Sequence, residues 1–145
     1  MTDPLSKRRL KLWIRLLGVT RAAEGRLREF LRTRHETTLP RFDVMAALYR
    51  RREGISMTEL SRMLLVSNGN ATAVVDRLER DGLVRRMASD TDRRTVLVTL
   101  TADGTAAFEG WAADHEAEVN DIFSDLTEQE IDLLTDILKR MGGAK

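Results

Sequence analysis

The stretch from Ser56 to Leu100 reads SMTELSRMLLVSNGNATAVVDRLERDGLVRRMASDTDRRTVLVTL, and it decides the fold. Its pattern predicts a helix, a turn, a second helix and then a two-stranded hairpin with an arginine-rich tip. Ser56 and Glu59 have the spacing of a capping box, which satisfies two backbone amides at the start of the first helix. Asp81-Gly82 ends the second helix, because glycine suits the left-handed position past a helix end.

The second helix of this stretch has an apolar face and a polar face. Its apolar residues, Ala71, Val74, Val75 and Leu78, recur at spacings of three and four. The polar face suits a reader of the DNA major groove, since asparagine bonds adenine and threonine offers a hydroxyl or a methyl group. Taken alone, the helix is equally consistent with a solvated polar face. The candidate DNA-binding residues are the expected N-cap, Ser67, and the outward residues Asn68, Asn70, Thr72, Ala73 and Arg77.

Two short strands are predicted after this helix, over residues 84–87 and 95–101. The second is rich in β-branched residues, and Val96, Val98 and Leu100 alternate onto one face. The strand pattern therefore predicts a small hairpin after the second helix.

The polar turn of the hairpin ends in two adjacent arginines, Arg93 and Arg94. The narrow minor groove of DNA attracts guanidinium groups through its negative potential. Asp92 is placed to hold one of these arginines through a charge-assisted hydrogen bond. The turn alone is also consistent with an exposed loop, but helix, turn, helix, hairpin and basic tip in this order together favour DNA binding.

The run from Asp76 to Arg86, DRLERDGLVRR, is followed by Asp92-Arg93-Arg94 and by Leu100-Thr101. These residues resemble the signature of MarR-family transcriptional regulators, and the resemblance extends over almost the whole chain. It implies a homodimeric winged-helix protein that binds palindromic operators and releases them when a small molecule binds. It also implies that the helix from about Asn68 is the recognition helix and that Arg94, with Arg93, enters the minor groove.

Composition indicates one globular domain of 145 residues, with 42% hydrophobic and 32% charged residues. The absence of cysteine rules out disulfides and thiol catalysis, and it fits a reducing cytosol. We see no signal peptide and no apolar run long enough to span a bilayer, so we expect a cytoplasmic protein without a membrane partner. With two histidines and no cysteine, we expect no metal site and no cofactor.

The net charge of +1 is unevenly distributed along the chain. Residues 1–52 hold 14 Lys or Arg and 5 Asp or Glu, a net charge of +9, whereas residues 102–145 hold 3 and 11, a net charge of −8. This asymmetry indicates a basic working surface, a basic end that pairs with the acidic end, or both.

Long amphipathic helices are predicted at both ends of the chain, over residues 7–34 and 102–123. A last helix starts at a second capping box, Thr127 to Glu130. The apolar stripe of the first helix exceeds what one small winged-helix core can cover, which indicates a partner chain. We therefore expect a mainly α fold with a small β-hairpin wing, in which 1–36 and 102–145 are dimerisation helices and 40–101 is the winged helix-turn-helix DNA-binding region.

A further helix is predicted to open at Pro40, which suits a first-turn position. It ends in Arg50-Arg51-Arg52. These cations complement the negative end of the helix dipole, so they are explained by structure alone. A position near DNA phosphates is the alternative.

The resemblance places an effector pocket between the dimerisation helices and the winged helix. Composition says only that most of the matching residues are apolar or aromatic, and core packing is the commoner role for each. The candidate lining residues are Trp13, Leu16, Leu17, His35, Arg41, Phe42, Met45 and His115, with Trp111 as a further wall residue.

A narrower resemblance concerns the runs KLWIRLL (11–17), TLPRFD (38–43) and VSNGN (66–70). They are similar to a subgroup that controls aromatic-acid catabolism, some members of which respond to aryl-CoA thioesters. Such a ligand needs cations for its phosphates. Alternatively, the cations only add to non-specific DNA attraction or to solubility. The candidate phosphate-binding residues are Lys7, Arg8, Arg9, Lys11 and Arg15, together with Arg41.

Three classes of function are compatible with a winged helix. We favour a repressor that a small aromatic ligand, or its CoA thioester, releases from double-stranded DNA. A winged helix used only for protein contacts or dimerisation, without ligand response, is the alternative, but it leaves the wing arginines without a role. An enzyme is not expected, because the sequence has no nucleophile–base pairing, no phosphate loop and no paired carboxylates in a plausible cleft.

Overall fold

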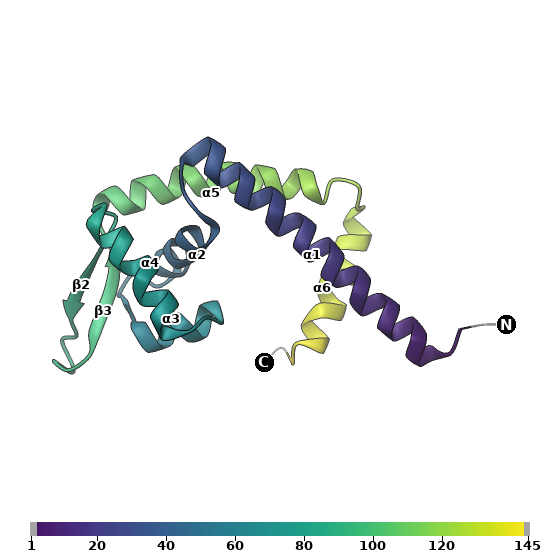
Figure 1. The fold of residues 1–145 in the computed structure, drawn as a ribbon, viewed down its shortest axis with the longest axis horizontal. Helices are drawn as coiled ribbons and strands as arrows, with labels where there is room; N and C mark the ends of the chain where they lie inside the picture. Colours follow the sequence, from purple (N-terminus) through teal and green to yellow (C-terminus); the bar gives the residue numbers. More distant parts are fainter. Residues whose placement is uncertain (1–2, 144–145) are drawn as a thin grey trace.

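The computed structural model describes residues 3–143. A compact winged-helix body lies at one end of the molecule, and long helices extend from it (Figure 1). The chain order of the elements is α1 Leu5–His35, α2 Leu39–Arg50, β1 Ile55–Ser56, α3 Met57–Leu64, α4 Asn68–Arg80, β2 Val84–Ala88, β3 Val96–Leu100, α5 Ala102–Ile122 and α6 Glu128–Met141. The predicted mainly α fold with a small wing is confirmed.

Helix α2 forms the centre of the core. The Thr38 hydroxyl caps it by accepting from the Arg41 N–H, and Pro40 lies in its first turn, where no N–H is needed. Five of its residues are buried, and the other elements pack around them. These five are Phe42, Val44, Met45, Ala47 and Leu48, and their buried neighbours include Leu31, Leu60, Val75, Leu78, Val98 and Phe108.

Helices α3 and α4 form the predicted helix-turn-helix. The Ser56 hydroxyl accepts from the Glu59 N–H at 3.2 Å, as expected for an N-cap. The predicted capping box at this position is wrong in its second half, because the Glu59 carboxylate accepts from the Arg51 guanidinium at 3.0 Å instead. The box at Thr127 and Glu130 is complete.

The sheet has three strands in the described part of the chain, whereas the sequence predicts two. The strand order is β1-β3-β2, and β1 pairs with β3 through Ile55 opposite Val98. A two-residue strand is too short to show an alternating pattern, so sequence periodicity misses it. The predicted common face of β3 is only partly buried: Val98 is fully buried, but Val96 is 43% exposed because the core ends at the base of the wing.

The arginines that end α2 contribute to the structure. Arg51 pairs with Glu53 and Glu59, and the Arg52 guanidinium lies 4.9 Å from the centre of the Tyr49 ring. These contacts give Arg51 and Arg52 a role within the fold, and a contact with DNA phosphates stays an untested alternative.

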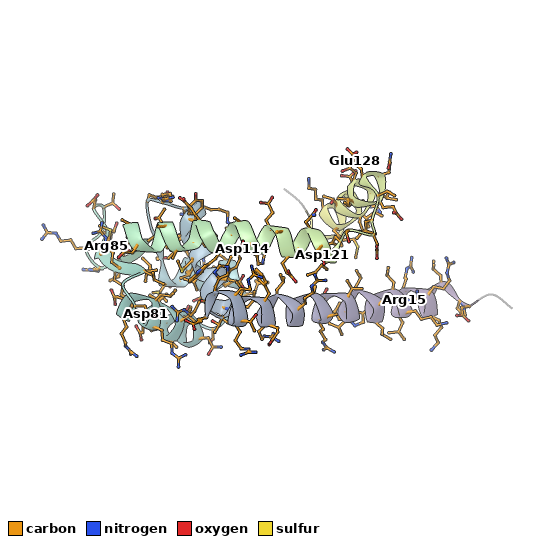
Figure 2. The ribbon with its side chains drawn as sticks, turned by 90° about the horizontal axis from the view of Figure 1, so that it is seen from above. Arg15, Asp81, Arg85, Asp114, Asp121 and Glu128 are labelled. Carbon is orange, nitrogen blue, oxygen red and sulfur yellow. The ribbon has the colours of Figure 1, made fainter. Side chains whose placement is uncertain are left out.

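Helices α1 and α5 run side by side (Figure 2). Arg26 of α1 donates to Glu118 at 2.6 Å and also to Asp121, and His35 Nε2 lies 2.8 Å from Asp114 Oδ2. The basic and acidic ends of the chain thus meet within one protomer.

The outer half of α1 and the whole of α6 leave most of their apolar side chains exposed in the described protomer. No residue of α6 is buried, and only Leu31 is buried in α1. The large exposed apolar side chains of α1 and α6 are Leu5, Leu10, Leu12, Trp13, Ile14, Val19, Ile131, Leu133, Leu134, Ile137, Leu138 and Met141.

None of the helices in the described part of the chain combines the length and the apolar character needed to cross a membrane.

Candidate nucleic-acid interface

Helix α4 presents an exposed polar surface beside the wing. Ser67 is its N-cap, and the Ser67 hydroxyl accepts from the Asn70 N–H at 3.2 Å, so this hydroxyl is already used within the fold. The other five predicted residues on the helix are all exposed: Asn68, Asn70, Thr72, Ala73 and Arg77.

The buried residues of α4 fix the direction of its outward face. Ala71, Val75 and Leu78 point into the core, and successive residues turn by about 100° around a helix. Gly69 and Ala73 therefore lie opposite the core. Asn70 lies on a flank of the helix, beside α2, rather than at the centre of the outward face.

The wing tip carries the predicted arginines in an exposed turn. Arg93 and Arg94 are both exposed, and neither forms an ion pair with any residue in the 3–143 range. The predicted role of Asp92 is wrong. Its carboxylate accepts from the Arg94 backbone N–H at 3.0 Å and from the Thr95 hydroxyl at 3.3 Å, because an aspartate bonds its own turn most easily. Asp92 therefore shapes the backbone of the tip and leaves the guanidinium groups free.

An ion-pair cluster that sequence reasoning missed joins the wing to α4. Arg86 of β2 donates to Asp76 at 2.6 Å and to Glu79 at 2.7 Å, and its backbone N–H donates to Glu79 as well. Residues 76 and 79 are one helical turn apart, and that spacing was the available clue. The cluster fixes the wing against α4.

The predicted effector residues do not share one pocket in the protomer. Trp13 and His35 are both on α1, 22 residues apart, which is about 33 Å along a helix. Trp13 is 58% exposed, and Leu16 and Leu17 lie near it. A single α1 helix cannot bring both groups to one ligand, so this part of the prediction is wrong for an isolated chain.

Four other effector candidates form two ring pairs between α1, α2 and α5. The His115 ring stacks on Phe42 with centroids 4.2 Å apart, and the Trp111 ring lies 6.4 Å from His35. Burial lowers the pKa of His115. Met45 is fully buried in the core, so packing accounts for it.

The basic side chains predicted to bind phosphates lie along the exposed outer half of α1: Lys7, Arg8, Arg9, Lys11 and Arg15. Lys11 forms an ion pair with Asp3. Arg41 is not part of this group, because α1 separates Arg15 from the start of α2 by about 30 Å. Arg41 instead donates to Asp81 at 2.7 Å, at the end of α4.

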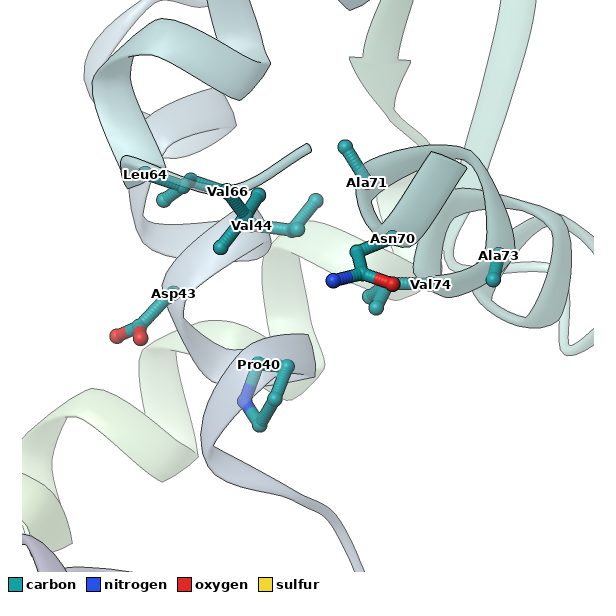
Figure 3. Close-up of a pocket in the computed structure, with 9 residues that line it drawn as sticks. All are labelled: Pro40, Asp43, Val44, Leu64, Val66, Asn70, Ala71, Ala73 and Val74. Atoms are coloured by element: carbon teal, nitrogen blue, oxygen red, sulfur yellow. The ribbon is translucent and has the colours of Figure 1, made fainter. Parts of the chain in front are cut away.

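A cavity of about 350 Å³ lies between α2 and α4 (Figure 3). Its walls are mainly apolar, and the Asn70 amide points into it from α4. Asp43 lies at its rim, where loss of hydration and, secondarily, the nearby Glu24 raise the pKa of that carboxyl. No distinct sequence pattern indicates this cavity, since its apolar walls look like core positions. The lining residues are Pro40, Asp43, Val44, Leu64, Val66, Asn70, Ala71, Ala73 and Val74.

A second hollow, of about 360 Å³, lies between α1, the end of α5 and α6. Leu12, Leu16 and Val19 contribute from α1, and Leu134 contributes from α6. This hollow is continuous with the exposed apolar faces of these helices. Phe123 lines both this hollow and a neighbouring one along α6.

The helix-turn-helix, the three-stranded sheet and the exposed basic wing define a winged-helix DNA-binding protein. The MarR family model matches residues 37–96, which include the helix-turn-helix and most of the wing. The transcriptional regulator MhqR of Bacillus subtilis is 30% identical over 138 residues, which is 95% of this chain and 94% of the relative. The chain therefore belongs to the MarR family of transcriptional regulators and is not an enzyme.

Solved structures agree with this assignment. A MarR variant from E. coli in complex with operator DNA is 27% identical and aligns with a TM-score of 0.81 over 96% of this chain and 99% of that one. AbsC from Streptomyces coelicolor, described as a MarR family regulator, is 24% identical with a TM-score of 0.85 over 98% and 97%, and it supports the fold.

Proposed function

We propose that this regulator is a homodimeric repressor that binds a palindromic operator through α4 and the wing and is released by a small aromatic ligand. One observation carries the DNA-binding part of the proposal. Arg86 at the base of the wing is paired with Asp76 and Glu79, whereas Arg93 and Arg94 at its tip have no ion pair in the described chain. Free guanidinium groups at the end of a fixed wing suit the minor groove of DNA.

A second copy of the chain is the proposed partner of α6 and the outer half of α1. Their apolar side chains are exposed, and the hollow between them is open. A symmetric pair of chains covers such faces with one self-complementary contact. The two α4 helices would then read half-sites about one turn of DNA apart, which makes the operator palindromic.

The cavity between α2 and α4 is the proposed effector site. Its volume is within the usual range for small-molecule pockets. A ligand there would contact Asn70 and Val74 of the reading helix as well as Val44 of α2. Binding would favour protomers in which α4 is displaced, and a coupling of about 1–3 kcal/mol would weaken operator binding 5- to 150-fold.

The polar groups of this cavity restrict the ligand. Asp43 accepts hydrogen bonds and repels anions, so a phenol or a neutral thioester fits better than a free aromatic carboxylate. The phosphates of a CoA ester would need cations from elsewhere. In a dimer, the candidates are the partner's copies of the basic residues on α1.

Operator binding tests the DNA-binding role. Fluorescence anisotropy on duplexes enriched from random DNA should give tight binding that Arg94→Ala weakens by roughly ten-fold or more, with the fold intact by circular dichroism. Arg32→Ala removes the same charge from α1 and should have little effect. Unchanged affinity in Arg94→Ala would favour a winged helix used for protein contacts.

Release by ligands tests the effector site. A hydroxylated aromatic thioester should dissociate the complex, and its free acid should do so less well. Asp43→Asn should shift the potency of the thioester by roughly ten-fold while operator affinity without ligand stays the same, since one good hydrogen bond to a charged group is worth about 1.5–3 kcal/mol. Asp125→Asn, in the hollow beside α6, is the matched control. Equal potencies in all three proteins would remove this cavity from consideration.

A further inference from the structure

A row of basic residues at spacings of four follows the outer half of α1: Lys7, Lys11 and Arg15. All three are exposed, and the segment 5–19 contains no acidic residue. Residues four apart lie on the same side of a helix, where like charges repel each other and weaken the helix. Lys11 pairs with Asp3, but Lys7 and Arg15 form no ion pair in the described chain. The protomer therefore leaves most of this basic row without a counter-charge.

A row of acidic residues with the same spacing follows α6: Glu128, Asp132 and Asp136. These three are also exposed, and none forms an ion pair with any residue that the structure describes. The charges of each row follow one another at about 6 Å along the helix axis. The basic row and the acidic row thus match in spacing and length and oppose each other in sign, yet no ion pair joins them within the described protomer.

Exposed apolar side chains border both rows. At 100° per residue, Ile14 and Val19 lie on either side of the basic row. Ile131 and Leu133 lie on either side of the acidic row in the same way. Charges that flank an apolar seam set partner choice and orientation in paired helices. A protein helix of opposite charge fits this surface better than DNA or a phosphate ester, because it also covers the apolar side chains.

We infer that the basic row of one copy pairs with the acidic row of a second copy, so that α1 lies along the partner's α6 at two equivalent contacts. The inference rests on the proposed homodimer and deepens it, since it assigns which helices meet. A contact between two α1 helices would bring two basic rows together, and a contact between two α6 helices would bring two acidic rows together. Both arrangements are disfavoured by repulsion, so the rows select one mode of dimerisation.

Reversing the charges of one row at a time tests the inference. Each single-row variant should dimerise roughly 100-fold more weakly than the unmodified protein in sedimentation equilibrium, because six modest attractions become repulsions. An equimolar mixture of the two variants should form heterodimers by native mass spectrometry, since its facing rows are again opposite in sign. A chain with all six substitutions should dimerise with itself for the same reason. The first variant combines Lys7→Glu, Lys11→Glu and Arg15→Glu, and the second combines Glu128→Lys, Asp132→Lys and Asp136→Lys.

The mixture and the six-fold variant are the matched controls, because they carry the same substitutions as the two weakened proteins. Dimers of unchanged affinity in both single-row variants, or a mixture without heterodimers, would overturn the inference. A reversed basic row that weakens operator binding but leaves the dimer intact would assign that row to DNA phosphates. An unmodified protein that stays monomeric at micromolar concentration would instead contradict the proposed homodimer, so the two failures are distinct.

Discussion

The Arg86 guanidinium donates to the Asp76 carboxylate at 2.6 Å and so joins strand β2 of the wing to the reading helix α4. Glu79 completes the cluster from the next turn of the same helix. Under the proposed function, the wing and the helix enter neighbouring grooves of one duplex at a fixed separation. We therefore regard this cluster as the part of the structure that sets their relative position.

Breaking this cluster should weaken operator binding more than it weakens the fold. Arg86→Ala should cost about 1 kcal/mol of stability, because the ion pairs are partly exposed, and it should reduce operator affinity several-fold. Arg85→Ala is the control for stability, since Arg85 is exposed and has no ion pair in the part of the chain described. Thermal unfolding and anisotropy measure the two effects. If Arg85→Ala destabilises as much as Arg86→Ala, the cluster does not hold the wing.

Gly104 should tolerate no side chain. A Cβ there would lie 1.9 Å from the Leu83 carbonyl oxygen, where the start of α5 packs on the turn before β2. Gly104→Ala should therefore destabilise the protein by about 1–3 kcal/mol in a denaturant titration. Gly110→Ala, in the same helix but with open space around it in the protomer, should change stability little or increase it. Similar losses in both variants would contradict this packing argument.

His115 should make stability depend on pH. Burial lowers the pKa of His115 below its usual 6.5 in the folded protein, so the unfolded chain takes up this proton first as the pH falls. Stability is therefore lost as the pH drops below about 6.5. His115→Phe keeps the stacking on Phe42 and removes the proton, so melting temperatures of variant and unmodified protein should diverge between pH 7.5 and 5.5. Parallel curves would show that this histidine does not titrate in that range.

Asn70 should contribute to base preference. It lies on the flank of α4 and also lines the cavity, so under the proposed function this one side chain would face both DNA and ligand. Asn70→Ala should relax the selected sequence at one position per half-site while non-specific binding stays largely unchanged. Selection of binding sites from random DNA measures this directly. An unchanged sequence preference would remove Asn70 from the readout.

Local patterns predicted the elements of the winged helix well. The spacing of Ala71, Val75 and Leu78 predicted α4 correctly. Gly82, just past the end of this helix, has φ +77°, as expected for a left-handed residue at that position. Ser67 was correctly expected as an N-cap. These features depend on neighbours within four residues, so a sequence shows them directly.

Features that depend on distant partners were predicted poorly. Glu59 bonds Arg51 instead of closing a capping box, and strand β1 exists only because β3 lies beside it. The family resemblance groups the effector residues into one pocket, but the length of α1 holds Trp13 far from His35. The cavity beside Asn70 comes from the angle between α2 and α4, which periodicity does not show.

The most direct test of the central claim compares operator and scrambled duplexes in one anisotropy titration at fixed salt. If α4 and the wing read DNA as a dimer, the selected duplex should contain two half-sites about 10 base pairs apart and bind with a Kd of about 10⁻⁸ to 10⁻¹¹ M. The scrambled duplex should bind at least roughly 10³-fold more weakly, and Arg93→Ala with Arg94→Ala should remove most of that difference. Equal affinity for the two duplexes would contradict sequence-specific binding by this protein.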